Sequence, residues 1–189
     1  MKFKELKQDI KLQEFRQNNS KLPRIYCDMD GVLCNFEQAA EKAVGMPLSQ
    51  WAKEPNKKFK TIRDKWKPIM NTRNFWSGLP WNPGGQRLWS FIRKYDPYIL
   101  SAYVEQTTDP NCIPGKSKWA RTRLGISGSK VNLVKRREKQ NFAKVGGMPT
   151  ILIDDYEKNI RQFRARGGIG IQHTSTSNTI NELKKLGFK

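Results

Sequence analysis

Two aspartates separated by one residue, Asp28 and Asp30, are the side chains of this sequence best suited to chemistry. They follow the short apolar run 25–27, which is typical of a buried strand, and Gly31 after them favours a turn. At such a turn, both carboxylates and a backbone carbonyl can surround one cation. Carboxylate, carbonyl and water oxygens are the ligands that Mg²⁺ prefers. The segment therefore predicts a site for a divalent cation.

Two other interpretations fit a pair of acids near a glycine. A calcium loop of the EF-hand type needs further oxygen ligands, a glycine at its sixth position and a distal glutamate. Here Gly31 is the fourth residue counted from Asp28, so the spacing disagrees. The second interpretation is a solvated turn in which Asp28 caps the following helix. Taken alone, the segment agrees with that cap.

A second acidic pair, Asp154 and Asp155, ends another apolar run far downstream. In open α/β sheets, ligands bind outside the carboxyl ends of the strands, so the two pairs are expected to share one site. Four carboxylates in one place repel each other strongly unless a cation holds them. The second pair therefore favours a metal site over the calcium loop and the helix cap.

A third apolar run, 98–102, ends in Ser101 and Ala102 and is followed by Lys116 and Lys118. A hydroxyl and a lysine suit the oxygens of a phosphate group. For both lysines the alternative is a solvated helix face, because 116–124 has the pattern of a helix start. These residues add a candidate phosphate site to the candidate metal site.

The order of these residues resembles the motifs of the haloacid dehalogenase-like (HAD) superfamily of phosphohydrolases, over residues 24–189. Within that superfamily, the chain is similar to the 5′(3′)-deoxyribonucleotidases. The segments that carry this similarity are Asp-Met-Asp-Gly-Val-Leu at 28–33, Asn-Phe-Glu at 35–37, Asn-Phe-Trp at 74–76, Pro-Gly-Gly at 83–85, and Cys112, Lys116 and Trp119. Two departures are Ser101-Ala102, where that family tends to have Thr-Ser-Pro, and the very basic linker 135–139.

The resemblance implies roles for the acidic residues. Asp28 would be the nucleophile that forms an aspartyl-phosphate, and Asp30 would donate and later accept a proton. Mg²⁺ would be held by Asp28, the carbonyl of Asp30, and the pair Asp154 and Asp155, most directly by Asp155. These are the groups that the chemistry of a metal-dependent phosphatase needs.

The resemblance also implies phosphate ligands. Ser101, Ala102 and Lys116 would bind the phosphoryl oxygens. Lys116 is preferred to Lys118 because it lies three residues before Trp119, as in the family segment.

Strand-like and helix-like segments alternate along the chain, including predicted helices at 157–165 and 178–186. This alternation predicts an α/β fold, a Rossmann-like HAD core with a central parallel sheet flanked by helices. We assign 23–36 and 81–189 to the core and 37–80 to a helical cap inserted after the first strand. Residues 1–22 are assigned to an N-terminal extension. Its residues 3–18 are expected to form an amphipathic helix that docks on the core, with a partner-binding arm as the alternative.

The cap segment is rich in aromatic residues. By resemblance, Phe36, Phe75 and Trp76 are expected to contact a nucleobase, because aromatic rings stack on bases; packing inside the cap is the alternative. Trp51 and Trp66 are expected in the cap core.

The chain is strongly basic, with a net charge of +19 and ten Lys or Arg against one acidic residue between positions 115 and 145. Such a field attracts anionic substrates, and it also fits contacts with nucleic-acid phosphates. The alternative is that the lysines serve solubility.

Other features exclude some classes of protein. No apolar run approaches the roughly 20 residues of a membrane helix. The three cysteines lack the spacing of a zinc site or of disulfide pairs, which favours the cytoplasm. The single histidine, His173, excludes mechanisms that need two histidines and is expected on the surface or in a loop.

Three functions remain for comparison with the structure. The first is a Mg²⁺-dependent phosphomonoesterase that hydrolyses nucleoside monophosphates, with 5′- or 3′-deoxyribonucleotides as the expected substrates. The second is a 3′- or 5′-end phosphatase that uses the basic surface to bind nucleic acid. The third is a non-catalytic nucleotide-binding protein. The complete set of acids favours the first two, and an aromatic cap favours a small ligand.

Overall fold

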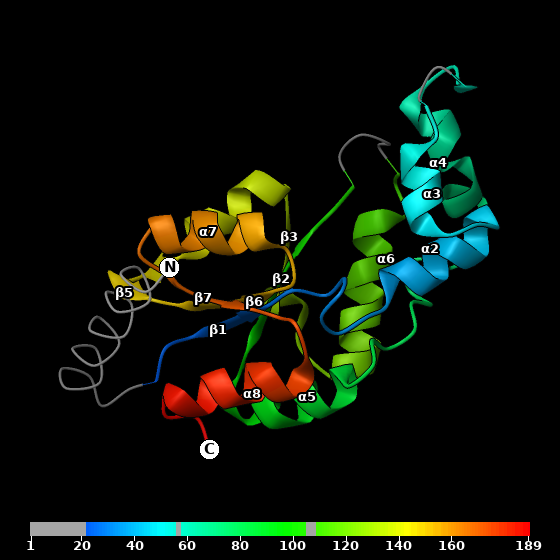
Figure 1. The fold of residues 1–189 in the computed structure, drawn as a ribbon. Helices are drawn as coiled ribbons and strands as arrows, with labels where there is room; N and C mark the ends of the chain where they lie inside the picture. Colours follow the sequence, from blue (N-terminus) through cyan, green and yellow to red (C-terminus); the bar gives the residue numbers. More distant parts are fainter. Residues whose placement is uncertain (1–21, 56–57, 105–108) are drawn as a thin grey trace.

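The chain folds around a parallel β-sheet. The computed structural model describes residues 22–55, 58–104 and 109–189. The sheet has five strands in the order β3-β2-β1-β6-β7, and each neighbouring pair is parallel. They are β1 (Ile25–Cys27), β2 (Tyr98–Ala102), β3 (Val131–Val134), β6 (Ile151–Asp154) and β7 (Ile169–Gln172). The predicted α/β fold with a central parallel sheet is confirmed (Figure 1).

Helices cover both faces of the sheet, as continuous apolar strands require. On one face, α7 (Glu157–Ala165) packs with the short helix η5 (Arg136–Phe142). On the other face, α5 (Gly85–Ile92) packs with α8 (Thr176–Lys185) (Figure 1). The central strands β1 and β6 are therefore buried along their whole length.

Local signals fix where the helices begin. α7 has the predicted bounds. The last helix begins at Thr176, ahead of its prediction, because Ser175 Oγ accepts a hydrogen bond from the Asn178 amide and caps the helix. The helix expected from Lys116 onward begins earlier, as α6 (Cys112–Trp119), and continues into a π-helical turn, η3 (Ala120–Leu124). The remaining short elements are η2 (Arg93–Tyr95), η4 (Gly128–Lys130), β4 (Lys144–Val145) and β5 (Met148–Pro149).

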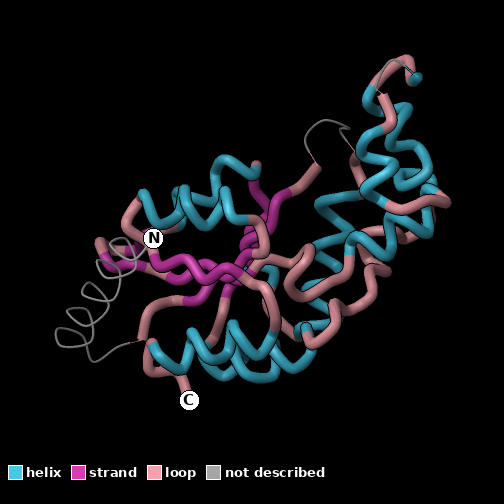
Figure 2. Tube along the Cα trace, viewed as in Figure 1, coloured by secondary structure: helices cyan, strands magenta, loops and turns pink. Residues whose placement is uncertain are grey.

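Three helices between β1 and α5 form a cluster beside the carboxyl end of β1 (Figures 1 and 2). We call this cluster the cap; it contains α2 (Phe36–Val44), α3 (Leu48–Lys53) and α4 (Ile62–Asn71). The buried Trp51 packs edge-on against Trp66, with ring centroids 5.2 Å apart. The Lys65 ammonium donates to the carbonyls of Ala52 and Glu54 at the end of α3. The cap thus has an aromatic core of its own.

The cap is tied to the rest of the molecule through the residues that follow α4. The indole N–H of Trp119, on α6, donates to the Leu79 carbonyl at 2.7 Å, and the Trp119 ring packs against Trp81. The N-terminal helix predicted over residues 3–18 falls outside the described residues. Among the helices that the structure describes, none combines the length and apolar character needed to span a bilayer.

Candidate active site

The first acidic pair lies where β1 stops. The amide of Asp28 still donates to the Ile153 carbonyl at 2.9 Å, so Asp28 continues the ladder between β1 and β6. Gly31 then takes a positive φ of 74°, and the amides of Leu33 and Cys34 both donate to the Met29 carbonyl. Glycine adopts this conformation without steric cost, so a tight turn replaces a longer strand. The turn presents Asp28 and Asp30 at the sheet edge.

The pairing of β1 with β6 brings the second acidic pair to the same edge. Carboxylate oxygens of Asp28, Asp154 and Asp155 all lie within 4.8 Å of one another. Asp155 also lies against the turn, because a Cβ at Gly31 would stand 2.3 Å from Asp155 Oδ2. Three hard oxygen donors at this spacing fit a hard divalent cation such as Mg²⁺. Three of the four carboxylates expected at one site thus meet, whereas the Asp30 carboxylate lies outside this group and pairs with Lys116.

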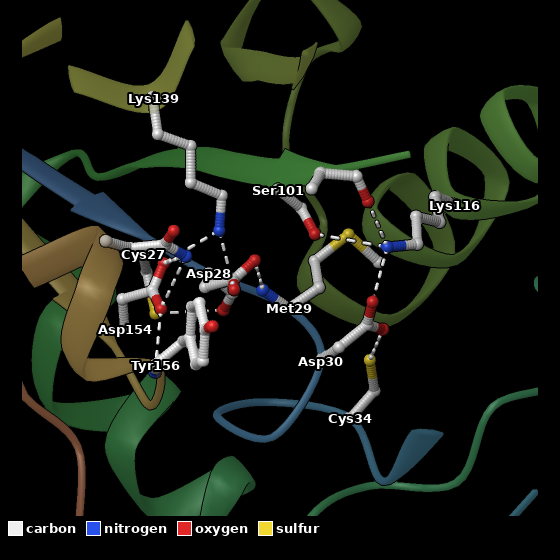
Figure 3. Close-up of polar contacts among 12 residues, drawn as sticks. Cys27, Asp28, Met29, Asp30, Cys34, Ser101, Lys116, Lys139, Asp154 and Tyr156 are labelled. Atoms are coloured by element: carbon white, nitrogen blue, oxygen red, sulfur yellow. Dashed lines mark hydrogen bonds and ion pairs between the residues drawn. The ribbon is translucent and has the colours of Figure 1, made fainter. Parts of the chain in front are cut away.

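A lysine from η5 joins the two acidic pairs. Lys139 Nζ lies 2.7 Å from Asp28 Oδ2 and 2.7 Å from Asp154 Oδ2, and its side chain is only 2% exposed (Figure 3). Asp154 is buried as well, and it accepts further hydrogen bonds from Asn159 Nδ2 and the Tyr156 amide. The Asp154 carboxylate is therefore held firmly in place, whereas Asp155 is solvent-exposed.

A second lysine organises the other half of the site. Lys116 Nζ, from α6, lies 2.5 Å from Asp30 Oδ2, 3.2 Å from Ser101 Oγ and 2.7 Å from the Ala102 carbonyl (Figure 3). An ammonium group has three donors, so all three are engaged. Cys34 Sγ donates to the other oxygen of Asp30. Lys116 is fully buried, and the competing Lys118 is exposed on the same helix.

The charges in the site shift the pKa values of its carboxyl groups. Burial alone raises the pKa of Asp28, but the charges of Lys139 and Lys116 outweigh it and hold the pKa below its usual value. Burial, and next the charge of Asp28, raise the pKa of Asp154 to about 6. Asp155 is exposed over part of its surface, but the desolvation of its carboxyl group, and next the charge of Asp28, raise its pKa to about 6 as well. Asp28 is thus anionic at neutral pH, and the other two carboxylates gain from a cation beside them.

A cavity of about 800 Å³ opens above these residues. Asp28, Asp30, Lys139 and Asp155 line its floor. Its wall on the cap side is formed by Phe36, Leu48, Trp66 and Trp76, and we call the three aromatic rings among them the aromatic wall. The rings of Phe36 and Trp76 stack on each other, with centroids 5.7 Å apart. The aspartates therefore line the floor of a cavity that has aromatic side chains on the wall facing the cap.

Only some of the residues predicted to bind the phosphate or the base line the main cavity. Ser101 and Lys116 are fully buried behind the cavity, and Ala102 reaches its surface. Phe75 is buried and lines a smaller cavity of about 290 Å³ instead. Trp76 lines both cavities and donates its indole N–H to Asp109 at 2.7 Å.

One expectation needs correction. Lys139, expected in a basic linker, belongs to the helix η5 and contacts Asp28. Its position just after a strand of the sheet, where ligands collect, is the signal that could have identified it. Trp66 packs against Trp51 in the cap core as expected, and it also lines the cavity. His173 lies in the loop after β7, as one of its two expected locations; it is buried there, and its ring hydrogen-bonds Thr179 Oγ1 at 2.8 Å.

Comparisons with known proteins agree with the fold. No protein family and no curated protein sequence matches this chain. A solved hydrolase from Streptococcus pneumoniae TIGR4 is similar, with a TM-score of 0.55 and 14% identity; the match covers 87% of this chain and 99% of that one. A protein from Thermotoga maritima named as a beta-phosphoglucomutase has a TM-score of 0.51 and 12% identity, with coverage of 87% and 99%. The chain thus shares the Rossmann-like α/β fold of these two proteins.

Proposed function

We propose that this protein is a Mg²⁺-dependent phosphomonoesterase of the HAD type that hydrolyses nucleoside monophosphates through an aspartyl-phosphate. The observation that carries the proposal is the environment of Asp28. Its carboxylate faces a cavity, lies within 4.8 Å of two carboxylates suited to a cation, and contacts a buried lysine. A lowered pKa keeps Asp28 anionic, as a nucleophile must be.

The reaction takes place in two steps. In the first, an Asp28 oxygen attacks phosphorus in line with the ester oxygen; the new P–O bond forms while the bond to the leaving group breaks. Asp30, in its protonated form, gives its proton to the departing alkoxide. In the second step, water attacks the phosphorus of the aspartyl-phosphate and passes a proton to Asp30. The bond to Asp28 breaks, and inorganic phosphate leaves.

Positive groups around the nucleophile offset the charge of the phosphate. Mg²⁺, held by Asp28, Asp155, Asp154 and the Asp30 carbonyl, would screen the repulsion between the nucleophile and the phosphate when bound. Lys139 is placed to contact both Asp28 and a phosphoryl oxygen, because its ammonium lies at the cavity floor. These charges act in a partly enclosed site, where electrostatic stabilisation is strongest.

Ser101, Ala102 and Lys116 have a different part in the proposal. Lys116 already uses its three donors, so it binds a phosphoryl oxygen only by giving up one of its present acceptors. While it keeps them, it orients the proton-transferring Asp30. Ser101 is buried and accepts from Lys116, so it holds the lysine in place, whereas Ala102, at the end of β2, reaches the cavity surface and can adjoin the phosphate.

The aromatic wall supports a nucleotide substrate. Phe36 and Trp66 offer ring surface to the same cavity as the aspartates, and a nucleobase stacks on such surfaces. Trp76 is buried and supports the Phe36 ring from behind. Phe75 is left out of this role, because it lines the other cavity. A cavity of about 800 Å³ lies within the usual range for small-molecule sites.

The proposal is tested by phosphate release. The protein is assayed with Mg²⁺ against ribo- and deoxyribonucleoside monophosphates and against sugar phosphates that lack a base, with Asp28→Asn as the control. We expect release from nucleotides in the wild type and a loss of at least about 10³-fold in the variant, because an amide is a poor nucleophile. Equal rates for both proteins would remove Asp28 as nucleophile. Nucleotide binding without hydrolysis would favour the non-catalytic protein.

A further inference from the structure

Basic side chains line the cavity apart from the catalytic floor. Arg136 and Arg137 come from η5, and Lys158 comes from the first turn of α7. All three are exposed, and none forms an ion pair with another described residue. We call them the basic rim. Three unpaired cations at the wall of a cavity create a positive potential that attracts an anion.

The two glutamates that adjoin the basic rim in the sequence, Glu138 and Glu157, are engaged elsewhere. Glu138 accepts a hydrogen bond from the Lys135 amide and caps η5. Glu157 pairs with Arg161 on the outer surface of α7. The charges of the rim are therefore available to a ligand.

The basic rim lies close to the nucleophile. Arg136 and Arg137 belong to the same short helix as Lys139, whose ammonium contacts Asp28. Two or three residues of a 3₁₀-helix span about 4–6 Å along its axis. The Arg136 guanidinium lies over the Tyr156 ring, 4.8 Å from its centroid, and this stacking orders it. A ligand anchored at Asp28 thus has a second group of positive charges within its own length.

We propose that the basic rim binds a second phosphate group of the substrate. The substrate class is then a nucleotide phosphorylated on both sides of its sugar, with one phosphate at Asp28, the other at the rim and the base at the aromatic wall. Arginine forks suit a phosphate that is held but not transferred. This inference rests on the proposed function and names its substrate class. Two sources share this chemistry: a free nucleoside 3′,5′-bisphosphate and the end of a nucleic-acid strand.

The test compares substrates within each protein. Specificity constants are measured for a deoxynucleoside monophosphate, for the matching 3′,5′-bisphosphate and for a terminally phosphorylated dinucleotide. The proteins are the wild type, R136A/R137A and the matched control R121A/R123A, which removes the same charge from exposed positions of η3 that line neither cavity. In the wild type, we expect at least about a tenfold preference for the second phosphate, the gain that one additional ion-paired contact supplies.

The ratio of the specificity constant for the bisphosphate to that for the monophosphate is expected to fall towards one in R136A/R137A. In R121A/R123A, this ratio is expected to stay at the wild-type value. An equal fall in both variants would mean that the overall charge, and not the rim, attracts the substrate. An unchanged ratio in R136A/R137A would overturn the proposal. A gain for the bisphosphate alone assigns the site to a small molecule, whereas a gain for the dinucleotide as well assigns it to strand ends.

A binding measurement separates this inference from the proposed function. The three proteins are titrated calorimetrically with the monophosphate and the bisphosphate in EDTA, where no turnover is expected. If no substrate is hydrolysed in the kinetic assay but the bisphosphate binds at least tenfold more tightly, only to proteins with an intact rim, the catalytic proposal fails and the second-phosphate site stands. If hydrolysis occurs but the monophosphate and the bisphosphate bind equally tightly, the catalytic proposal stands and the second-phosphate site fails.

Discussion

Lys139 Nζ lies 2.7 Å from Asp28 Oδ2 and so connects a helix after β3 to the strand end of β1. The same ammonium contacts Asp154 at 2.7 Å, which links the two acidic pairs through one cation. Two buried carboxylates this close would repel each other, and the lysine offsets that repulsion. Lys139 therefore stabilises the arrangement and lowers the pKa of the nucleophile at once.

Removal of the charge of Lys139 should affect both activity and stability. In Lys139→Met, we expect phosphate release to fall at least about 10²-fold, the usual cost of losing one charged contact in a polar active site. We also expect a loss of about 3–5 kcal/mol in the free energy of unfolding without Mg²⁺, because two buried carboxylates lose their partner. Activity is measured at temperatures where melting curves show that the variant is folded.

Lys118→Met is the matched control, because Lys118 is exposed and its side chain does not line the main cavity. The free energy of unfolding of this variant should stay within about 0.5 kcal/mol of the wild-type value, and its rate of phosphate release within about twofold. A folded Lys139→Met protein with wild-type activity would show that Lys139 has only a structural part.

Asp154 and Asp155 should contribute differently to the metal site. Asp155→Asn should weaken Mg²⁺ binding at least about tenfold, as loss of a metal contact does, with little effect on stability because Asp155 is exposed. Asp154→Asn should instead destabilise the fold, since Asp154 is buried and bonded to Lys139, Asn159 and the Tyr156 amide. Calorimetric Mg²⁺ titration and urea unfolding separate the two effects. Similar affinities for Asp155→Asn and the wild type would place the cation elsewhere.

Much of the fold was predictable because its signals are local. The site residues lie at the end of a short apolar strand or directly after it, and α7 has its predicted bounds. The meeting of Asp28 with Asp154 and Asp155 also followed from the rule that parallel strands present their carboxyl ends at one edge.

The rest of the site depended on contacts that no local pattern encodes. Lys139 and its neighbours Arg136 and Arg137 form one basic run in the sequence, and only the packing of η5 beside α7 turns the first inward and leaves the others exposed. Phe75 and Trp76 are adjacent in the sequence, yet they line different sets of cavities. The direction of a side chain in a turn comes from tertiary contacts.

The stability of the protein should fall at acidic pH through His173. Burial lowers the pKa of this histidine below its ordinary value of 6.5, so the folded state resists its protonation. Its contribution to stability is therefore fully present above pH 6.5 and is lost as the pH falls through the lower pKa of the folded state. Urea unfolding at pH 7.5 and pH 5.0 measures the loss.

His173→Gln is the control, because glutamine can keep a hydrogen bond to Thr179 but does not titrate. The wild type should lose more stability between the two pH values than this variant does. Equal losses would assign the whole pH dependence to other groups.

Gly31 offers a test of the metal site by geometry alone. Gly31 and Gly45 have the same φ of 74°, but a Cβ at Gly31 meets Asp155 Oδ2 at 2.3 Å, whereas a Cβ at Gly45 meets nothing within 4 Å. Both alanine variants carry the same backbone strain, about 1–2 kcal/mol for a left-handed residue with a side chain. Only Gly31→Ala displaces the Asp155 carboxylate.

We therefore expect Gly31→Ala and Gly45→Ala to lose similar stability in urea unfolding, and only Gly31→Ala to lose Mg²⁺ affinity and phosphate release, each at least about tenfold. Because both variants carry the same backbone strain, the difference between them reports the effect of displacing the Asp155 carboxylate. Equal Mg²⁺ affinities in the two variants would mean that Asp155 accommodates the methyl group or does not hold the cation, and Asp155→Asn distinguishes these. A loss confined to Gly31→Ala would identify the contact between the turn and Asp155 as the feature that sets the metal site.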